Sequence, residues 1–139
     1  MAYIQSSSFL RNVLALDAAA CAATGLLSLG AGALAGPLGF PAEFLRGAGL
    51  VLLPCAAALA FLASRVRLPR LAIHAVIGIN ILWVADSILT LVSGWFQPTA
   101  LGIAFVLAQA AVVAVVTELE VIGLKKSTPV EVETAALRL

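Results

Sequence analysis

Hydrophobic residues form four long, uninterrupted blocks along the chain, and short polar or proline-containing segments separate the blocks. A helix that crosses a membrane needs ~20 mostly apolar residues, and each block is about that long. The blocks are rich in Ala, Leu and Val, and they lack the alternation of apolar and polar positions that strands of a membrane β-barrel show. The pattern therefore predicts four membrane-spanning helices, over residues 12–34, 46–64, 70–93 and 99–123.

The segments between these blocks are too short to fold on their own, so we expect one all-α membrane domain over residues 1–139. Pro37 and Pro41 separate the first predicted helix from the second. The expected architecture is a four-helix transmembrane bundle built as two helical hairpins. Residues 128–131 (Thr-Pro-Val-Glu) have the pattern of a helix N-terminus, which predicts a short cytoplasmic helix over residues 129–137.

Basic residues are unevenly distributed between the two sides of the predicted bundle. With four spans, the N-terminus, the second connection and the C-terminus lie on one side, and only Arg46 belongs to the other. Short loops rich in Lys and Arg stay in the cytoplasm. This predicts a protein of the bacterial inner membrane with both termini cytoplasmic. The basic residues on the predicted cytoplasmic side are Arg11, Arg65, Arg67, Arg70, Lys125, Lys126 and Arg138.

The composition agrees with this pattern and argues against several other classes of protein. Hydrophobic residues make up 63% of the chain and charged residues 11%, whereas soluble domains average ~45–50% and ~25%. Eight basic and seven acidic residues leave a net charge of +1, so the overall field does not attract nucleic acid. The expected partners are membrane lipids, including bound lipid, together with other membrane subunits or further copies of the chain.

Residue types that common catalytic sites require are scarce. His74 is the only histidine and Met1 the only methionine, so a haem held between helices lacks a pair of axial ligands. Cys21 and Cys55 are single cysteines without the C-x-x-C spacing of redox motifs. No three potential zinc ligands have the spacing of a metal site. The sequence predicts no catalytic residues, no cofactor and no metal, and a protein that is not an enzyme.

Polar side chains within the predicted helices are the candidates for function, because an ionisable residue inside a membrane costs roughly 2.5–3.5 kcal/mol on insertion scales. In the first helix, Asp17 begins a polar stripe at helical spacing that continues through Cys21, Thr24 and Ser28. Two interpretations remain open. Asp17 either lines a path for protons or substrate, or belongs to an interhelical seam in which it pairs with Arg11 or with an arginine of the second connection.

The third helix has the most polar face in the chain, and Asp86 lies at the edge of that face. Asp86 is either a protonatable site or subunit contact, or a buried group bonded to a neighbouring helix. Gln109 lies at the depth of Asn80, which predicts a hydrogen bond between the two side chains. Glu120 is expected to reach the membrane interface near Lys125 and Lys126. The candidates for intramembrane polar contacts or partner contacts are Asp17, Asn80, Trp83, Asp86, Thr90, Gln109 and Glu120.

Several short runs resemble a family of uncharacterised integral membrane proteins from proteobacteria. The runs are Leu38–Pro41 (Leu-Gly-Phe-Pro), Leu45–Gly49 (Leu-Arg-Gly-Ala-Gly), Ile79–Val84 (Ile-Asn-Ile-Leu-Trp-Val) and Ser93–Trp95 (Ser-Gly-Trp). The resemblance covers nearly the whole chain and implies four helices, but it implies no activity. The four-helix layout is also similar to that of DoxX-like proteins.

Two functions follow from these observations. We expect a non-catalytic accessory or assembly subunit of a larger membrane complex, which packs against its partners through polar and small-residue helix faces. The alternative is a small homo-oligomeric transporter or channel, in which the intramembrane carboxylate of Asp17 or Asp86 faces a shared aqueous path.

Overall fold

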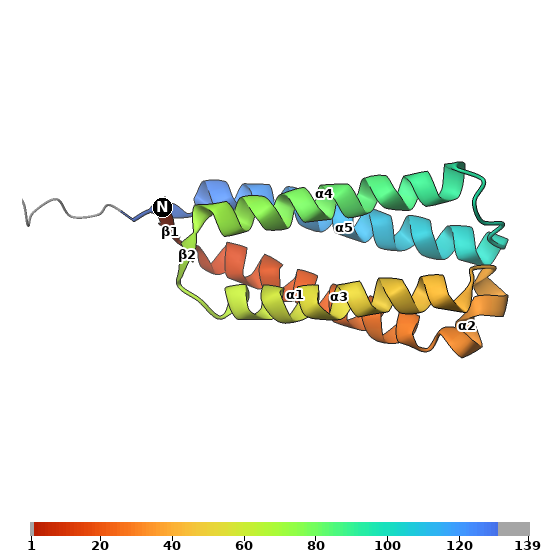
Figure 1. Cartoon of the computed structure of the whole chain (residues 1–139). Helices are drawn as coiled ribbons and strands as arrows, with labels where there is room; N and C mark the ends of the chain where they lie inside the picture. The colour runs from red at the N-terminus through yellow and green to blue at the C-terminus, as the bar shows by residue number, and fades with distance from the viewer. Residues whose placement is uncertain (1, 131–139) are drawn as a thin grey trace, which may run out of the picture.

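The computed structural model describes residues 2–130, and within this range the chain forms five helices and three short strands (Figure 1). Four helices are long and apolar enough to cross a membrane: α1 (Ser8–Leu29), α3 (Ala42–Ala63), α4 (Arg70–Val92) and α5 (Ala100–Lys126). The fifth helix, α2 (Ala31–Leu38), is short. The prediction of a helical bundle with four helices of membrane-spanning length is confirmed.

The first predicted helix, over residues 12–34, differs most from the structure. Helix α1 starts earlier because Ser7 caps its N-terminus, where the Ser7 hydroxyl accepts a hydrogen bond from the Leu10 amide at 3.1 Å. Helix α1 ends at Gly30 and α2 begins directly after it, so the predicted span is divided between two helices. Gly39 ends α2 with a φ of 73°, a left-handed conformation that glycine adopts without strain.

Helix α4 starts at the predicted residue and ends one residue early, whereas α3 and α5 differ by a few residues from their predicted ranges. Helix α3 begins directly after Pro41, four residues before the predicted start. Helix α5 begins after Thr99, whose hydroxyl accepts a hydrogen bond from the Gly102 amide at 3.1 Å. It continues to Lys126, almost one turn beyond the predicted end. Both extensions lengthen helices that already satisfy the spanning requirement, so they leave the number of spans unchanged.

Three short strands form an antiparallel sheet at one end of the bundle, which we call the strand end (Figure 1). The strands are β1 (Tyr3–Gln5), β2 (Arg67–Pro69) and β3 (Thr128–Pro129), in the order β2-β1-β3. The sheet joins the N-terminal segment to the α3–α4 connection and to the segment after α5. The helix predicted over residues 129–137 is wrong at its start, because Pro129 lies in β3. Residues 131–139 lie outside the described residues.

The long helices pack as two pairs, α1 with α3 and α4 with α5, and α1 against α5 joins the pairs (Figure 1). Helices α1 and α3 approach closely because two glycines face each other: a Cβ on Gly49 would lie 2.8 Å from the Gly25 carbonyl oxygen. In the described part of the chain, α3 and α4 are consecutive long helices yet make no comparable contact. Space therefore remains between the pairs on the α3–α4 side.

The two buried apolar clusters lie near opposite ends of this arrangement. One is centred on Leu10, Leu14, Leu68 and Ile73 and includes residues of the strand end. The other contains Leu38, Phe40, Leu45 and Val106 and lies around α2. Apolar packing therefore stabilises both ends of the bundle, and the polar residues of the long helices meet between the two clusters.

Candidate functional site

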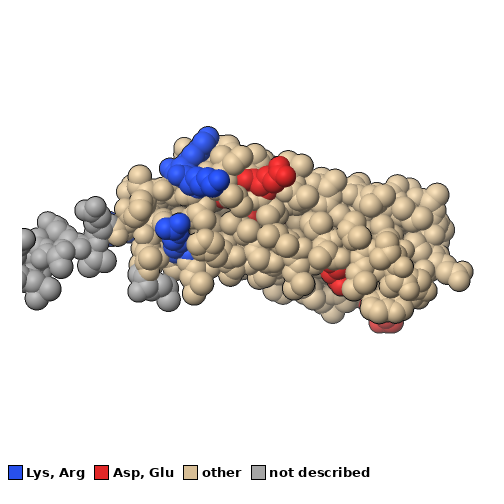
Figure 2. All heavy atoms as spheres, turned by 90° about the horizontal axis from the view of Figure 1, so that it is seen from above, with Lys and Arg blue, Asp and Glu red and all other residues tan. Residues whose placement is uncertain are grey.

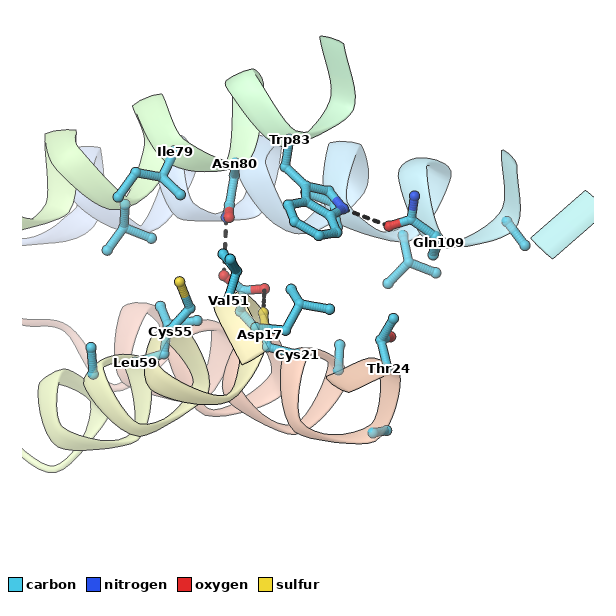
Figure 3. Close-up of a pocket in the computed structure, with 18 of the residues that line it drawn as sticks. Asp17, Cys21, Thr24, Val51, Cys55, Leu59, Ile79, Asn80, Trp83 and Gln109 are labelled. Carbon is cyan, nitrogen blue, oxygen red and sulfur yellow. Dashed lines mark hydrogen bonds between the residues drawn. The ribbon is translucent and has the colours of Figure 1, made fainter. Parts of the chain in front are cut away.

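Three polar side chains from three long helices meet between the helix pairs, and we call them the acid–amide cluster (Figure 3). The Asn80 side-chain nitrogen on α4 donates to Asp17 Oδ2 on α1 at 3.0 Å and to Glu120 Oε2 on α5 at 3.1 Å. Asp17 is 1% exposed, Glu120 0% and Asn80 7%. The cluster is thus enclosed by the protein, at the seam where the two pairs join.

All but one of the buried polar atoms of the two carboxyl groups have a hydrogen-bond partner. An amide nitrogen carries two hydrogens, and the two carboxyl groups take both from Asn80. The Cys21 thiol lies 3.8 Å from Asp17 Oδ1 and can donate weakly to it. The second Glu120 oxygen, Oε1, is buried and has no hydrogen-bond partner among the described residues. A buried oxygen without a donor is costly, so this atom is the unusual feature of the cluster.

A second polar network, the Trp83 network, joins α4 to α5 about one helical turn away. The Trp83 indole nitrogen donates to Gln109 Oε1 at 2.7 Å, and Gln109 Nε2 donates to the Ser87 hydroxyl at 2.9 Å. Ser87 in turn donates to the Trp83 carbonyl oxygen at 2.7 Å. The predicted hydrogen bond between Asn80 and Gln109 is therefore wrong. Each amide instead bonds within its own network.

The location expected for Glu120 is also wrong. Glu120 is fully buried within α5 and accepts a hydrogen bond from Asn80, so its side chain does not extend toward the last lysines. It faces inward with Val116 and Gly123. Its helical spacing from Gln109, eleven residues or three turns, is the sequence signal that could have indicated an inward position.

No basic residue among residues 2–130 pairs with Asp17, so its predicted pairing with Arg11 or with an arginine of the second connection is wrong. Within residues 2–130, the ion pair found is Arg46 with Glu43. The Asp17 carboxyl group instead accepts hydrogen bonds from the Asn80 amide and the Cys21 thiol.

The remaining candidates of α4 are placed differently from one another. Thr90 is buried, whereas Asp86 is exposed. No hydrogen bond or ion pair of the Asp86 side chain is found among the described residues. The alternative in which Asp86 is a buried group bonded to a neighbouring helix is therefore wrong, and Asp86 is a carboxyl group without a partner among residues 2–130.

Two adjoining cavities occupy the space between the helix pairs. The first, of about 420 Å³, is lined by all four long helices and includes Asp17 and Asn80 in its wall (Figure 3). The second, of about 460 Å³, extends toward α2 and includes Glu43 and Asp86. Both have Thr24, Val51, Leu52, Trp83, Phe105 and Gln109 in their walls, so they are neighbours along the bundle.

The walls of both cavities are mainly apolar, with a few polar groups. The charged side chains in the walls are all acidic: Asp17 in the first cavity, and Glu43 and Asp86 in the second. A mostly apolar pocket with a few converging polar groups is typical of a site for a small ligand. In the described part of the chain, no three His, Cys, Asp or Glu residues are grouped to hold a metal ion.

Basic side chains gather at the strand end. Figure 2 shows the Lys and Arg residues of one face at this end, and none toward the α2 end of that face. Lys126 lies over the Phe9 ring at 4.3 Å, and the Arg65 guanidinium lies over the Phe61 ring at 4.5 Å. Of the residues predicted to determine topology, Arg138 lies outside the described residues. The others belong to the first turn of α1, to the α3–α4 connection and α4 start, and to the end of α5: Arg11, Arg65, Arg67, Arg70, Lys125 and Lys126.

Comparison of the chain with family models, with curated proteins and with solved structures finds no match. The resemblance to the proteobacterial membrane-protein family, and to the layout of DoxX-like proteins, therefore stays a prediction.

Proposed function

We propose that the chain is a small transporter of the bacterial inner membrane, with both termini cytoplasmic, that binds an amphiphilic molecule between its helix pairs. The observation that carries this proposal is the pair of adjoining cavities lined by all four long helices. Helices α3 and α4 make little contact, so a molecule dissolved in the bilayer can enter from the side. In this proposal, several copies of the chain assemble into a homo-oligomer that carries out transport.

The cavity walls favour a ligand with an apolar body and a cationic or neutral polar group. Val51, Leu52 and Phe105 provide the apolar surface common to both cavities. The charged residues in the walls are carboxylates, and in this low-dielectric setting they would repel an anionic group. The exposed Asp86 carboxyl is the group best placed to receive a cation, because it has no partner within the described chain.

Binding can be tested through Trp83, which lies in the wall of both cavities. A Trp95→Phe background leaves Trp83 as the only tryptophan. Brominated alkyl chains of equal length, with an ammonium, hydroxyl or carboxylate head group, then serve as contact quenchers in nanodiscs. We expect saturable quenching by the ammonium compound, with the carboxylate at least about tenfold weaker, or ~1.4 kcal/mol. Equal, non-saturating quenching by all three would show simple partition into lipid and contradict the proposal.

Transport is tested as uptake of the same ammonium compound into proteoliposomes. We expect uptake to be lost when Asp17→Asn and Asp86→Asn are combined. Glu118→Gln is the matched control, since it removes an exposed carboxyl of α5 outside both cavities. Uptake that survives the double substitution would contradict a transport role for these carboxylates.

A second candidate is the accessory or assembly subunit of a larger membrane complex, and exposed Asp86 favours it. A carboxyl group on a spanning helix, without a partner in the described part of its chain, would be stabilised by a polar group of a neighbouring subunit. Gentle extraction through a C-terminal tag, followed by native mass measurement, would then find foreign subunits in fixed ratio. We expect Asp86→Asn to reduce their recovery and Glu118→Gln to leave it unchanged. Unchanged recovery in Asp86→Asn would contradict this role.

A further inference from the structure

We infer that the acid–amide cluster is an intramembrane proton-binding site, in which Asp17 and Glu120 hold one proton between them. Two observations carry this inference independently. The first is that both carboxyl groups bond to the same Asn80 nitrogen, so they lie close together. The second is that Glu120 Oε1 is fully buried and that no described residue donates a hydrogen bond to it. The inference deepens the proposed transport function, but proton binding does not depend on a ligand in the cavities.

The number of hydrogens in the cluster leads to this conclusion. If both carboxyl groups were ionised, two negative charges would lie close together at an almost fully buried site, without a basic partner among residues 2–130. One Asn80 amide cannot offset both charges, because its two hydrogens are already shared between them. A proton on the carboxyl group of Glu120 removes one charge. It also turns the unpartnered oxygen from an acceptor without a donor into a donor that can bond to Asp17.

The groups around the cluster do not supply an alternative counter-charge. Cys21 on α1 bonds to Asp17, and Cys55 on α3 lines the same cavity; both are thiols. Helix α4 contributes the neutral Asn80 amide, and its nearest titratable groups along the helix are Asp86 and His74, each six residues away. Neither forms a hydrogen bond or ion pair with the cluster in the described chain.

A proton fits the cluster better than a metal cation. Sodium and similar ions need several oxygen ligands arranged around them. Here the Asn80 amide points its nitrogen, not its oxygen, at the two carboxyl groups and occupies the position between them. A proton needs only one donor and one acceptor oxygen, and the cluster offers both.

The cluster also lies where a change of charge would move the helices. It joins α1 to α4 and α5, whereas nearer the two ends close glycine contacts bring Gly123 of α5 against Leu10 of α1 and Gly102 of α5 against Leu38 of α2. Loss of the shared proton would place two like charges across this seam and favour its opening, next to the first cavity. Protonation and access to the cavity are then linked through one set of side chains.

The direct test is infrared spectroscopy of the reconstituted chain, which detects the C=O stretch of a protonated carboxyl group in the apolar region. We expect one such band at neutral pH, lost in Asp17→Asn with Glu120→Gln and retained in Glu118→Gln. The band is expected to fall as pH rises and to be unchanged when sodium replaces potassium. Circular dichroism and gel filtration check that each variant folds. Absence of the band in the natural sequence would overturn the inference, as would its displacement by sodium.

Labelling with dicyclohexylcarbodiimide, an apolar reagent that attacks protonated carboxyl groups, identifies the residue. The carboxyl O–H adds across one C=N bond, and the acyl group then migrates to nitrogen, so a stable N-acylurea forms without a leaving group. We expect one reagent per chain on Asp17 or Glu120, and at least about tenfold slower labelling at high pH. Labelling of both residues on one chain would overturn the shared proton. Because neither test contains an amphiphile, their failure is distinct from failure of the binding experiment with Trp83.

Discussion

Asp17 and Glu120 are more than one hundred residues apart in the sequence, yet their carboxyl groups accept hydrogen bonds from the same side-chain nitrogen. That nitrogen belongs to Asn80, so three of the four long helices meet at one amide group. Both carboxyl groups are enclosed by the protein, which makes Asn80 the donor that holds the acid–amide cluster together.

Replacing Asn80 by leucine is expected to destabilise the bundle more than replacing Gln109 by leucine. Asn80→Leu leaves two buried carboxyl groups without their donor, and each such group costs ~1–3 kcal/mol. Gln109→Leu removes hydrogen bonds of the part-buried Trp83 network, and an interhelical bond in membranes averages only ~0.6 kcal/mol. Thermal unfolding in one detergent, followed by gel filtration, measures the difference. Equal losses would contradict the central role of Asn80.

Gly102 is predicted to tolerate no side chain. A Cβ at this position would lie 1.9 Å from the Leu38 carbonyl oxygen, so Gly102→Ala must push α2 away from α5. Overpacking of this kind costs typically 1–3 kcal/mol. Gly78→Ala is the matched control, because nothing lies within 4 Å of the added atom and alanine favours the helix. The two variants are compared by thermal unfolding. A Gly102→Ala protein as stable as Gly78→Ala would mean that α2 is not held against α5.

The predicted orientation can be tested with two cysteines introduced at opposite ends of the bundle. Cys21 and Cys55 are first replaced by alanine. Ser64→Cys lies at the strand end and Gln97→Cys in the connection at the other end, and both side chains are exposed. In intact spheroplasts, a membrane-impermeant maleimide should label position 97 and reach position 64 only after lysis. The reverse order would place the basic strand end outside the cytoplasm.

The strand end is expected to depend on Ile4, which is 3% exposed and opposite Leu68 in the sheet. Ile4→Asp buries a charge there and should release β1, because a buried unpaired charge is costly. Tyr3→Asp is the control on the same strand, since Tyr3 is 45% exposed. The exchange rates of backbone amide hydrogens measure the effect. Amides of residues 3–5 should exchange at least about tenfold faster in Ile4→Asp than in Tyr3→Asp. Equal protection would show that the sheet does not depend on this side chain.

The sequence by itself determined the number and the location of the long helices. An apolar block of about twenty residues can satisfy its backbone in a membrane only as a helix, so length and composition are enough. The same reasoning singled out Asp17, Asn80 and Gln109 as the costly groups that need an explanation. The sequence also indicated the uneven distribution of basic residues, which remains the basis of the predicted orientation.

Only the tertiary structure decided which polar groups meet. Apart from a few polar positions, the long helices are apolar around their whole circumference, so the sequence carries little information about how far each is rotated and shifted against its neighbours. Gln109 and Glu120 lie three turns apart on one face of α5, so the axial position of α5 along α4 decides which of them meets Asn80. That position follows from close contacts such as Gly123 against Leu10. The pairing of β1 with β2 and β3 likewise depends on segments that come together only once the helices have packed. Helix formation is a local property of the chain, whereas the acid–amide cluster and the cavities result from how the helices fit against one another.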